Sequence, residues 1–128
     1  MTPEELKLRT KAFALRFIKV FKALPRNEEA RTLGKQMLSS GTSVAANYRA
    51  VCRSRSKAEF LARLGIVVEE IDETFLWLEL LSDSGILSRE RLKELQREAN
   101  ELMAIFVASQ LTAKGITPNS SIRKYANP

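Results

Sequence analysis

The segment Ser39-Ser40-Gly41-Thr42-Ser43 decides how many helices the chain contains. Small residues of weak helix propensity are typical of a loop, and propensity alone leaves a loop and a helix equally open. Apolar residues nevertheless keep a helical spacing across the segment, from Met37 to Val44 in seven residues. This spacing favours one continuous helix, whose small residues would let a neighbouring helix approach closely.

Signals for helix starts and stops divide the remaining chain around this helix. Four starts combine a capping side chain with a favourable first turn. They are Thr2-Pro3-Glu4-Glu5, Asn27-Glu28-Glu29, Ser56-Lys57-Ala58-Glu59 and Ser88. Pro25 ends the first helix, and Gly85 and Gly115 end the third and fourth. Because short loops force neighbouring helices to run in opposite directions, the sequence predicts an all-α, antiparallel, up-down-up-down four-helix bundle.

The predicted bundle accounts for almost the whole chain. A length of 128 residues has room for one domain. Residues 1–115 are expected to form the bundle. Residues 116–128 contain Pro, Asn and Ser without periodicity, so a flexible C-terminal tail is expected there.

Missing residue types exclude most catalytic chemistry. The chain has no histidine and a single cysteine, Cys52, which removes Ser-His and Cys-His pairs, imidazole zinc sites and intramolecular disulfides. We also find no Gly-rich phosphate loop. We therefore expect a protein that is not an enzyme and has no catalytic residue, cofactor or metal. With no signal peptide or membrane-spanning run, a cytoplasmic location is expected.

Charge is distributed unevenly along the chain. Residues 1–63 carry 14 Lys and Arg against 5 Asp and Glu, whereas residues 64–128 carry 7 against 10. A basic half joined to an acidic half indicates either an anionic partner, such as nucleic acid, or self-association of unlike faces. Composition does not choose between these two interpretations.

The first and third helices carry more apolar residues than one core needs. Around Trp77 the third helix is apolar on nearly all sides, with Leu76 and Leu80, and the first helix adds Leu15 and Ile18 beside its core stripe. A second buried face would explain the excess, so these residues are predicted to form the interface of a homo-oligomer. The alternative is a wide core with Trp77 half exposed at its rim.

A basic cluster lies around the junction of the second and third helices. It consists of Arg49, Arg53, Arg55, Lys57 and Arg63. The first helix adds a second basic strip, which contains Lys7, Lys11, Arg16, Lys19 and Lys22. Because arginine presents a planar fork to phosphate oxygens, we predict contacts with nucleic acid through the cluster and Lys19. Tyr48 lies beside the cluster, where it could stack on a base, but a single aromatic residue does not by itself indicate nucleic-acid binding. The alternative is that the cations complement the helix end or pair with Glu69, Glu70 or Glu73.

Asn47 shares a helical register with Val44 and Val51. We therefore expect its side chain to point inward and to form a hydrogen bond between helices. A polar residue in a helical core is typically a device that sets register or oligomeric state.

Several segments together resemble a known family. They are 43–50, Arg53-Ser54-Arg55-Ser56, Glu59-Phe60, 64–67, Glu73 and 77–81. They resemble the bacterial four-helix-bundle family known from open reading frames in intervening sequences of the 23S ribosomal RNA gene. That family's motif continues after the asparagine with Ile-Ala-Glu-Gly, whereas this chain has Tyr48-Arg49-Ala50-Val51, which is typical of a divergent branch.

This resemblance implies a continuous second helix, a homo-oligomer in the form of a pentameric ring, and no enzymatic activity. In architecture the chain is also similar to the basic pentameric barrels that accompany reverse transcriptases of diversity-generating retroelements. A protein partner encoded by a neighbouring gene is therefore a further expectation. Two functional hypotheses remain open: a non-catalytic oligomer that binds RNA or other nucleic acid, and a structural or protein-interaction module.

Overall fold

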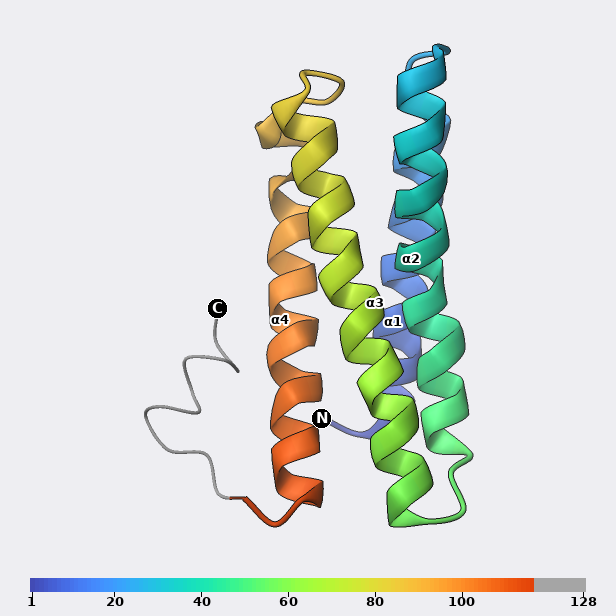
Figure 1. Ribbon diagram of the computed structural model, residues 1–128, viewed down its shortest axis with the longest axis vertical. Helices are drawn as coiled ribbons and strands as arrows, with labels where there is room; N and C mark the ends of the chain where they lie inside the picture. The colour runs from blue at the N-terminus through green and yellow to red at the C-terminus, as the bar shows by residue number, and fades with distance from the viewer. Residues whose placement is uncertain (117–128) are drawn as a thin grey trace.

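The computed structural model describes residues 1–116, which contain four helices (Figure 1). Helix α1 spans Pro3–Lys22, α2 spans Glu28–Cys52, α3 spans Lys57–Asp83 and α4 spans Arg89–Ala113. No strand occurs in these residues, so the all-α prediction is confirmed. The tail expected from residue 116 onward lies, apart from Ile116, outside the described residues.

Each helix begins at the capping side chain that the sequence indicates. The side chains of Thr2, Asn27, Ser56 and Ser88 each accept a hydrogen bond from the backbone N–H three residues ahead. At the end of α3, Gly85 takes a left-handed φ of +80°, and the Leu87 N–H donates to the Leu81 carbonyl at 3.0 Å. Local chemistry therefore sets the helix boundaries.

The small-residue segment lies inside α2, which is continuous as the apolar spacing indicates. Gly41 is buried against the ring of Phe17 in α1, where a Cβ atom would stand 2.6 Å from Cγ of that ring. On another side of the segment, the Thr74 hydroxyl of α3 donates to Ser40 Oγ at 2.9 Å. The absence of bulky side chains thus allows α1 and α3 to pack closely on the middle of α2.

One apolar core joins the four helices, and it includes Phe13, Phe17, Met37, Ile71 and Phe106. Helix α2 packs on α1 and α3, α3 packs on α4, and α1 makes only slight contact with α4. The chain reverses direction at each loop, so α1 and α3 run the same way (Figure 1). None of the described helices has the length and hydropathy needed to cross a membrane.

Candidate nucleic-acid and subunit interfaces

The structure brings four of the predicted basic residues together where α2 ends and α3 begins. Arg49, Arg53, Arg55 and Lys57 are all exposed, and we call this set the basic corner. Among residues 1–116 none of the four belongs to an ion pair. Pairing of Arg49 with the acids of α3, the alternative considered from the sequence, is therefore not present.

Two hollows lie beside the basic corner. Lys7 of α1 joins Arg49, Cys52 and Arg53 around a hollow of about 210 Å³. A second hollow of about 540 Å³ is lined by Arg55, Lys57 and Phe60, together with Pro3, Tyr48, Val51, Cys52, Ser54 and Ser56. Both sides of the loop thus present cations beside an accessible depression.

Arg63 belongs to the basic cluster predicted from the sequence, but in the structure its side chain contacts other parts of the protein. Its guanidinium donates to the Ala50 carbonyl at 2.8 Å and forms an ion pair with Glu59 at 2.8 Å. The first contact gives a second donor to a carbonyl in the last turn of α2, which also accepts from the Arg53 N–H at 3.1 Å. The structure therefore gives Arg63 a structural role, and its contact with nucleic acid stays a prediction.

The basic strip predicted on α1 is divided among different faces of the helix. Lys7 lies beside the basic corner, whereas Arg16 and Lys19 line a cleft against α4. Lys11 and Lys22 are exposed beside the apolar residues of the outer face. Lys19 is therefore not part of the basic corner, with which it was grouped from the sequence.

The structure buries Tyr48 rather than Asn47, the opposite of what the sequence predicts. Tyr48 is buried against Phe106, with ring centroids 5.3 Å apart, and burial raises the pKa of its hydroxyl. Asn47 is only partly buried, and its amide donates to the Ser43 carbonyl of its own helix at 3.0 Å. The prediction that Asn47 points inward and bonds between helices is wrong, and the burial of Tyr48 leaves it unsuited to stacking on a base. Both positions fit the register of the Val44–Val51 stripe, and the larger apolar side chain takes the buried position.

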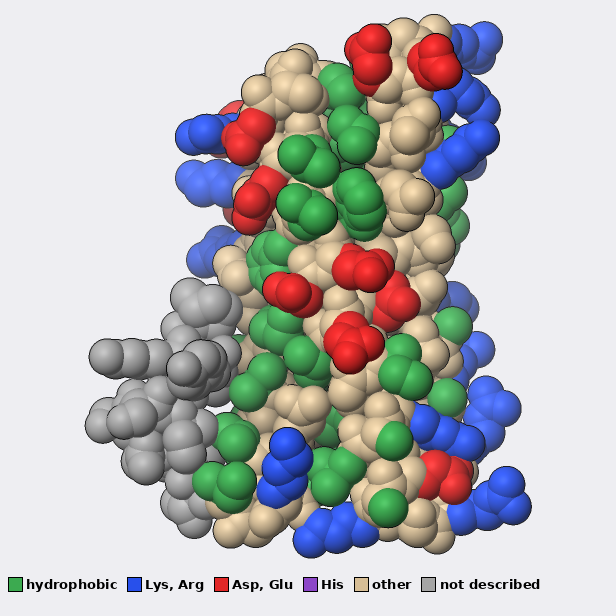
Figure 2. All heavy atoms as spheres, in the orientation of Figure 1, with side chains coloured by type: hydrophobic (Ala, Val, Ile, Leu, Met, Phe, Trp, Pro, Cys, Tyr) green, Lys and Arg blue, Asp and Glu red, His purple; other side chains and the backbone are tan. Residues whose placement is uncertain are grey.

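Apolar side chains are exposed on the outer faces of α1 and α3. Leu15 is 56% exposed and Leu76 is 47% exposed, and Ile18 and Leu80 are also exposed, as the sequence predicted for this set. Figure 2 shows hydrophobic and acidic side chains gathered over α3, with most Lys and Arg along the edges of this view.

Two further residues extend these faces beyond the sequence prediction. They are Leu8 on α1 and Ile66 on α3, both exposed. The sequence contains a signal for both residues. Leu8 precedes Leu15 by seven residues, and Ile66 precedes Leu76 by ten, so Leu8 lies on the same side of α1 as Leu15 and Ile66 on the same side of α3 as Leu76.

Trp77 differs from its neighbours on α3. It is half-buried and packs against the core, and its indole Nε1 is buried without a hydrogen-bond partner among the described residues. This arrangement agrees with the alternative of a tryptophan at the rim of a wide core. Leu76 and Leu80 are more exposed than Trp77, so they define the outer face of α3 better.

The acids of α3 lie beside this apolar face. Glu69 and Glu73 are exposed and Glu70 is partly buried. Burial raises the pKa of Glu70, and the charges of Glu73 and Glu69 raise it further. Within residues 1–116 no three His, Cys, Asp or Glu side chains are grouped so as to hold a metal ion.

These features define an all-α protein of four helices with a basic corner and two exposed apolar faces. The pattern of one family, the 23S rRNA-intervening sequence protein, matches residues 4–108. The chain belongs to this family, as its resemblance in sequence suggests.

A solved structure supports the same assignment. It is the crystal structure of a protein with unknown function from the S23 ribosomal protein family of Bacteroides thetaiotaomicron VPI-5482. It is 30% identical in sequence, with a TM-score of 0.80, and the match covers 86% of this chain and 98% of that one. No curated protein matches the chain.

Proposed function

We propose that this chain forms an up-down-up-down bundle that assembles as a non-catalytic, cytoplasmic homo-oligomer and binds RNA or another nucleic acid. The basic faces of α1 and α2 would supply the binding surface. The observation that carries the proposal is the basic corner, whose four exposed cations have no acidic partner among the described residues. Free cations held close together are the usual footprint of a phosphate-binding surface.

The chemistry of the basic corner suits phosphate more than a carboxylate surface. Three of its four residues are arginines, whose planar guanidinium matches the geometry of phosphate oxygens. The corner also lies at the start of α3, where the helix dipole favours negative charge. The family name refers to ribosomal RNA, which makes RNA the first nucleic acid to test.

Self-association is supported by two stripes on opposite faces of the subunit. The outer stripe of α1 comprises Leu8, Lys11, Leu15, Ile18 and Lys22. The outer stripe of α3 comprises Ile66, Glu69, Glu73, Leu76 and Leu80. The backbones of the two helices are not neighbours, and Figure 1 shows α3 in front and α1 behind it. One stripe carries lysines and the other glutamates among apolar residues of similar size.

The two stripes also lie at matching heights along the bundle. Phe17 of α1 contacts α2 at Gly41, and Thr74 of α3 contacts α2 at the adjacent Ser40, so Phe17 and Thr74 are level. Because both helices rise about 1.5 Å per residue in the same direction, each residue of the α1 stripe then lies at about the height of the α3 residue 58 positions later in the chain. Leu8 is level with Ile66, Lys11 with Glu69, Leu15 with Glu73, Ile18 with Leu76, and Lys22 with Leu80.

This correspondence favours head-to-tail contact between subunits standing side by side. The α1 stripe of one subunit would meet the α3 stripe of the next, with apolar contacts of Leu8 with Ile66 and of Ile18 with Leu76. A Lys11–Glu69 pair would lie between them. A contact between two different faces closes into a ring when the rotation between subunits permits it. The resemblance described above suggests a ring of five, which would repeat the basic corner around its circumference and raise affinity through avidity.

The alternative function is a structural or protein-interaction module without nucleic-acid binding, including one whose partner is encoded by a neighbouring gene. The exposed apolar face of α3 is the feature that favours it. The two functions differ in their dependence on the basic corner, so charge reversal there discriminates between them.

The test is fluorescence anisotropy with labelled oligouridylate between about 50 and 200 mM salt. For single-stranded RNA the logarithm of affinity should fall against the logarithm of salt concentration by about 0.7 for each phosphate neutralised. Arg53→Glu with Arg55→Glu should weaken binding at least tenfold and flatten that slope. The matched control is Arg89→Glu with Lys93→Glu, which changes net charge equally at the opposite end of the bundle.

The proposal is overturned if the wild-type protein does not bind at about 50 mM salt. It is also overturned if the two double variants bind equally well, because net charge rather than the basic corner would then explain the affinity. Circular dichroism of both variants checks that the helices remain folded.

A further inference from the structure

A cleft of about 400 Å³ separates part of α1 from part of α4. Its lining residues come from two segments, 16–23 and 87–95. They are Arg16, Lys19, Val20, Ala23, Leu87, Arg91, Leu92 and Leu95. The volume is at the lower end of the range seen for small-molecule pockets. Neither the basic corner nor the outer stripes contribute a residue to it.

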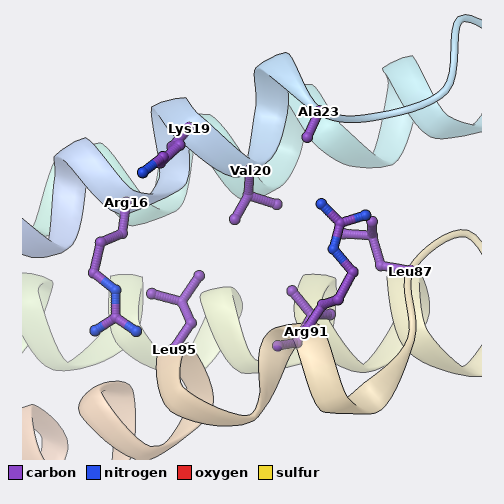
Figure 3. A pocket seen from close by; sticks show the side chains of 8 residues that line it. Arg16, Lys19, Val20, Ala23, Leu87, Arg91 and Leu95 are labelled. Atoms are coloured by element: carbon purple, nitrogen blue, oxygen red, sulfur yellow. The ribbon is translucent and has the colours of Figure 1, made fainter.

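Cations face this cleft from both helices. In Figure 3 the Arg16 side chain extends from α1 toward α4, and the Arg91 side chain extends from α4 toward α1. Val20 and Leu95 lie between them in this view. Together with Lys19 they place three positive charges around the cleft, and no acidic residue lines it. None of the three forms an ion pair within residues 1–116.

At the other end of the contact between α1 and α4, the two helices are joined by residues of opposite charge. There Arg9 of α1 donates to Glu98 of α4 through Nε at 2.8 Å and Nη2 at 2.6 Å, and it also contacts Glu101. Opposite charges thus hold α1 to α4 near Arg9, whereas the cations that line the cleft have no acidic partner within residues 1–116.

We propose that the α1–α4 cleft binds a small aliphatic carboxylate of the fatty-acid kind. Its carboxylate would pair with Arg16 or Arg91 at one end of the cleft, with Lys19 nearby, and its hydrocarbon chain would lie on Val20 and Leu95, which stand between the two arginines in Figure 3. The lining contains no aromatic ring on which a nucleobase could stack and no side-chain hydrogen-bond acceptor for a sugar or peptide. An anionic head on an aliphatic body is the ligand chemistry that matches both kinds of lining residue.

The test is titration of the full chain with decanoate below its micellar concentration, followed by calorimetry and by methyl NMR. We expect saturable binding of one decanoate per chain, with shifts of the Val20, Leu87, Leu92 and Leu95 methyl signals. Decanol, which lacks the charge, and inorganic phosphate, which lacks the chain, should each bind at least tenfold more weakly. Equal binding of decanol would overturn the proposal, because the cations would then contribute nothing.

Variants assign the binding to the cleft. Arg16→Gln with Arg91→Gln should weaken decanoate binding at least tenfold, as expected for losing hydrogen bonds to a charged group. Ala23→Trp keeps all three cations but fills the cleft and should also abolish binding. Lys93→Gln, on α4 but outside the lining, is the matched control and should bind as the wild type does. Wild-type affinity in either cleft variant, or no saturable binding at all, contradicts the proposal, and neither outcome affects the basic corner.

Discussion

Gly41 of α2 lies directly against the aromatic ring of Phe17 in α1, so that a Cβ atom at residue 41 would stand 2.6 Å from Phe17 Cγ. Phe17 is fully buried and meets the ring of Phe13 edge-on, with centroids 4.6 Å apart. The ring therefore has little freedom to move away from residue 41. This contact explains why a glycine occupies the middle of a long helix, where it weakens the helix itself.

Gly41→Ala is therefore expected to destabilise the fold although alanine favours helices. The helix gains about 1 kcal/mol from alanine, but overpacking against a fixed ring costs typically 1–3 kcal/mol, so the free energy of unfolding should fall by up to about 2 kcal/mol. Gly65→Ala is the matched control, because a Cβ atom there meets nothing within 4 Å. Urea unfolding at equal protein concentration should show opposite signs for the two variants, and a gain in both would contradict the contact.

Within the basic cluster, substitution of Arg63 should lower the stability of the fold, whereas substitution of Arg55 should not. Arg63→Met removes the hydrogen bond to the Ala50 carbonyl and the ion pair with Glu59, and should lower the free energy of unfolding by about 1–2 kcal/mol. Arg55→Met removes an exposed cation and should change stability by less than about 0.5 kcal/mol. Equal losses in thermal unfolding of the two variants would refute the structural role assigned to Arg63.

The stability of the subunit should decrease with rising pH through Glu70. Burial first, and the charges of Glu73 and Glu69 second, raise the pKa of Glu70 above its usual 4.5. The folded state then binds this proton more tightly than the unfolded state does. The contribution of Glu70 is therefore most favourable below about pH 4.5 and is lost as the pH rises from 4.5 through the raised pKa.

Glu70→Gln should consequently raise the free energy of unfolding at pH 7 and flatten its dependence on pH above 4.5. Glu79→Gln, which neutralises an exposed acid on the same helix, is the control. Urea unfolding at several pH values measures both. A Glu70→Gln variant less stable than the wild type at pH 7 would show that the carboxylate is stabilised in the folded protein, contrary to this assignment.

The proposed contact between the outer stripes can be tested by exchanging charges. Lys11→Glu and Glu69→Lys should each weaken assembly, by about 0.5–1 kcal/mol per interface, because each places like charges opposite one another. The two changes together should restore the wild-type oligomer. Light scattering over a dilution series measures the assembly state, and a double variant weaker than both single ones would exclude this pairing.

Leu76→Glu should dissociate the oligomer more strongly than either charge change. It places a carboxylate where about 2 kcal/mol of apolar burial per interface is expected. Leu76 is preferable to Trp77 for this purpose, since Trp77 also packs against the subunit's core. A wild-type protein that scatters as a clean 14.4 kDa monomer would remove the basis of the proposed assembly.

The residues that set the helix boundaries were readable without tertiary information. Caps such as Thr2 and Ser56 act on backbone N–H groups three residues away, so the sequence contains both partners of each interaction. The apolar spacing from Met37 to Val44 likewise predicted the continuity of α2. The exposed residues Leu15, Ile18, Leu76 and Leu80 were predicted as well, because an apolar residue outside the core stripe must lie on another face.

By itself, then, the sequence determined four helices, their ends and their apolar faces, because these depend on neighbours within about one helical turn. Tertiary structure decided which of Asn47 and Tyr48 is buried, since both fit the helical register and only packing against Phe106 discriminates between them. It also decided that Arg63 binds the Ala50 carbonyl and that Arg16 and Arg91 line one cleft. Those contacts join residues at least 13 positions apart, whose distance is set by helix packing rather than by local sequence.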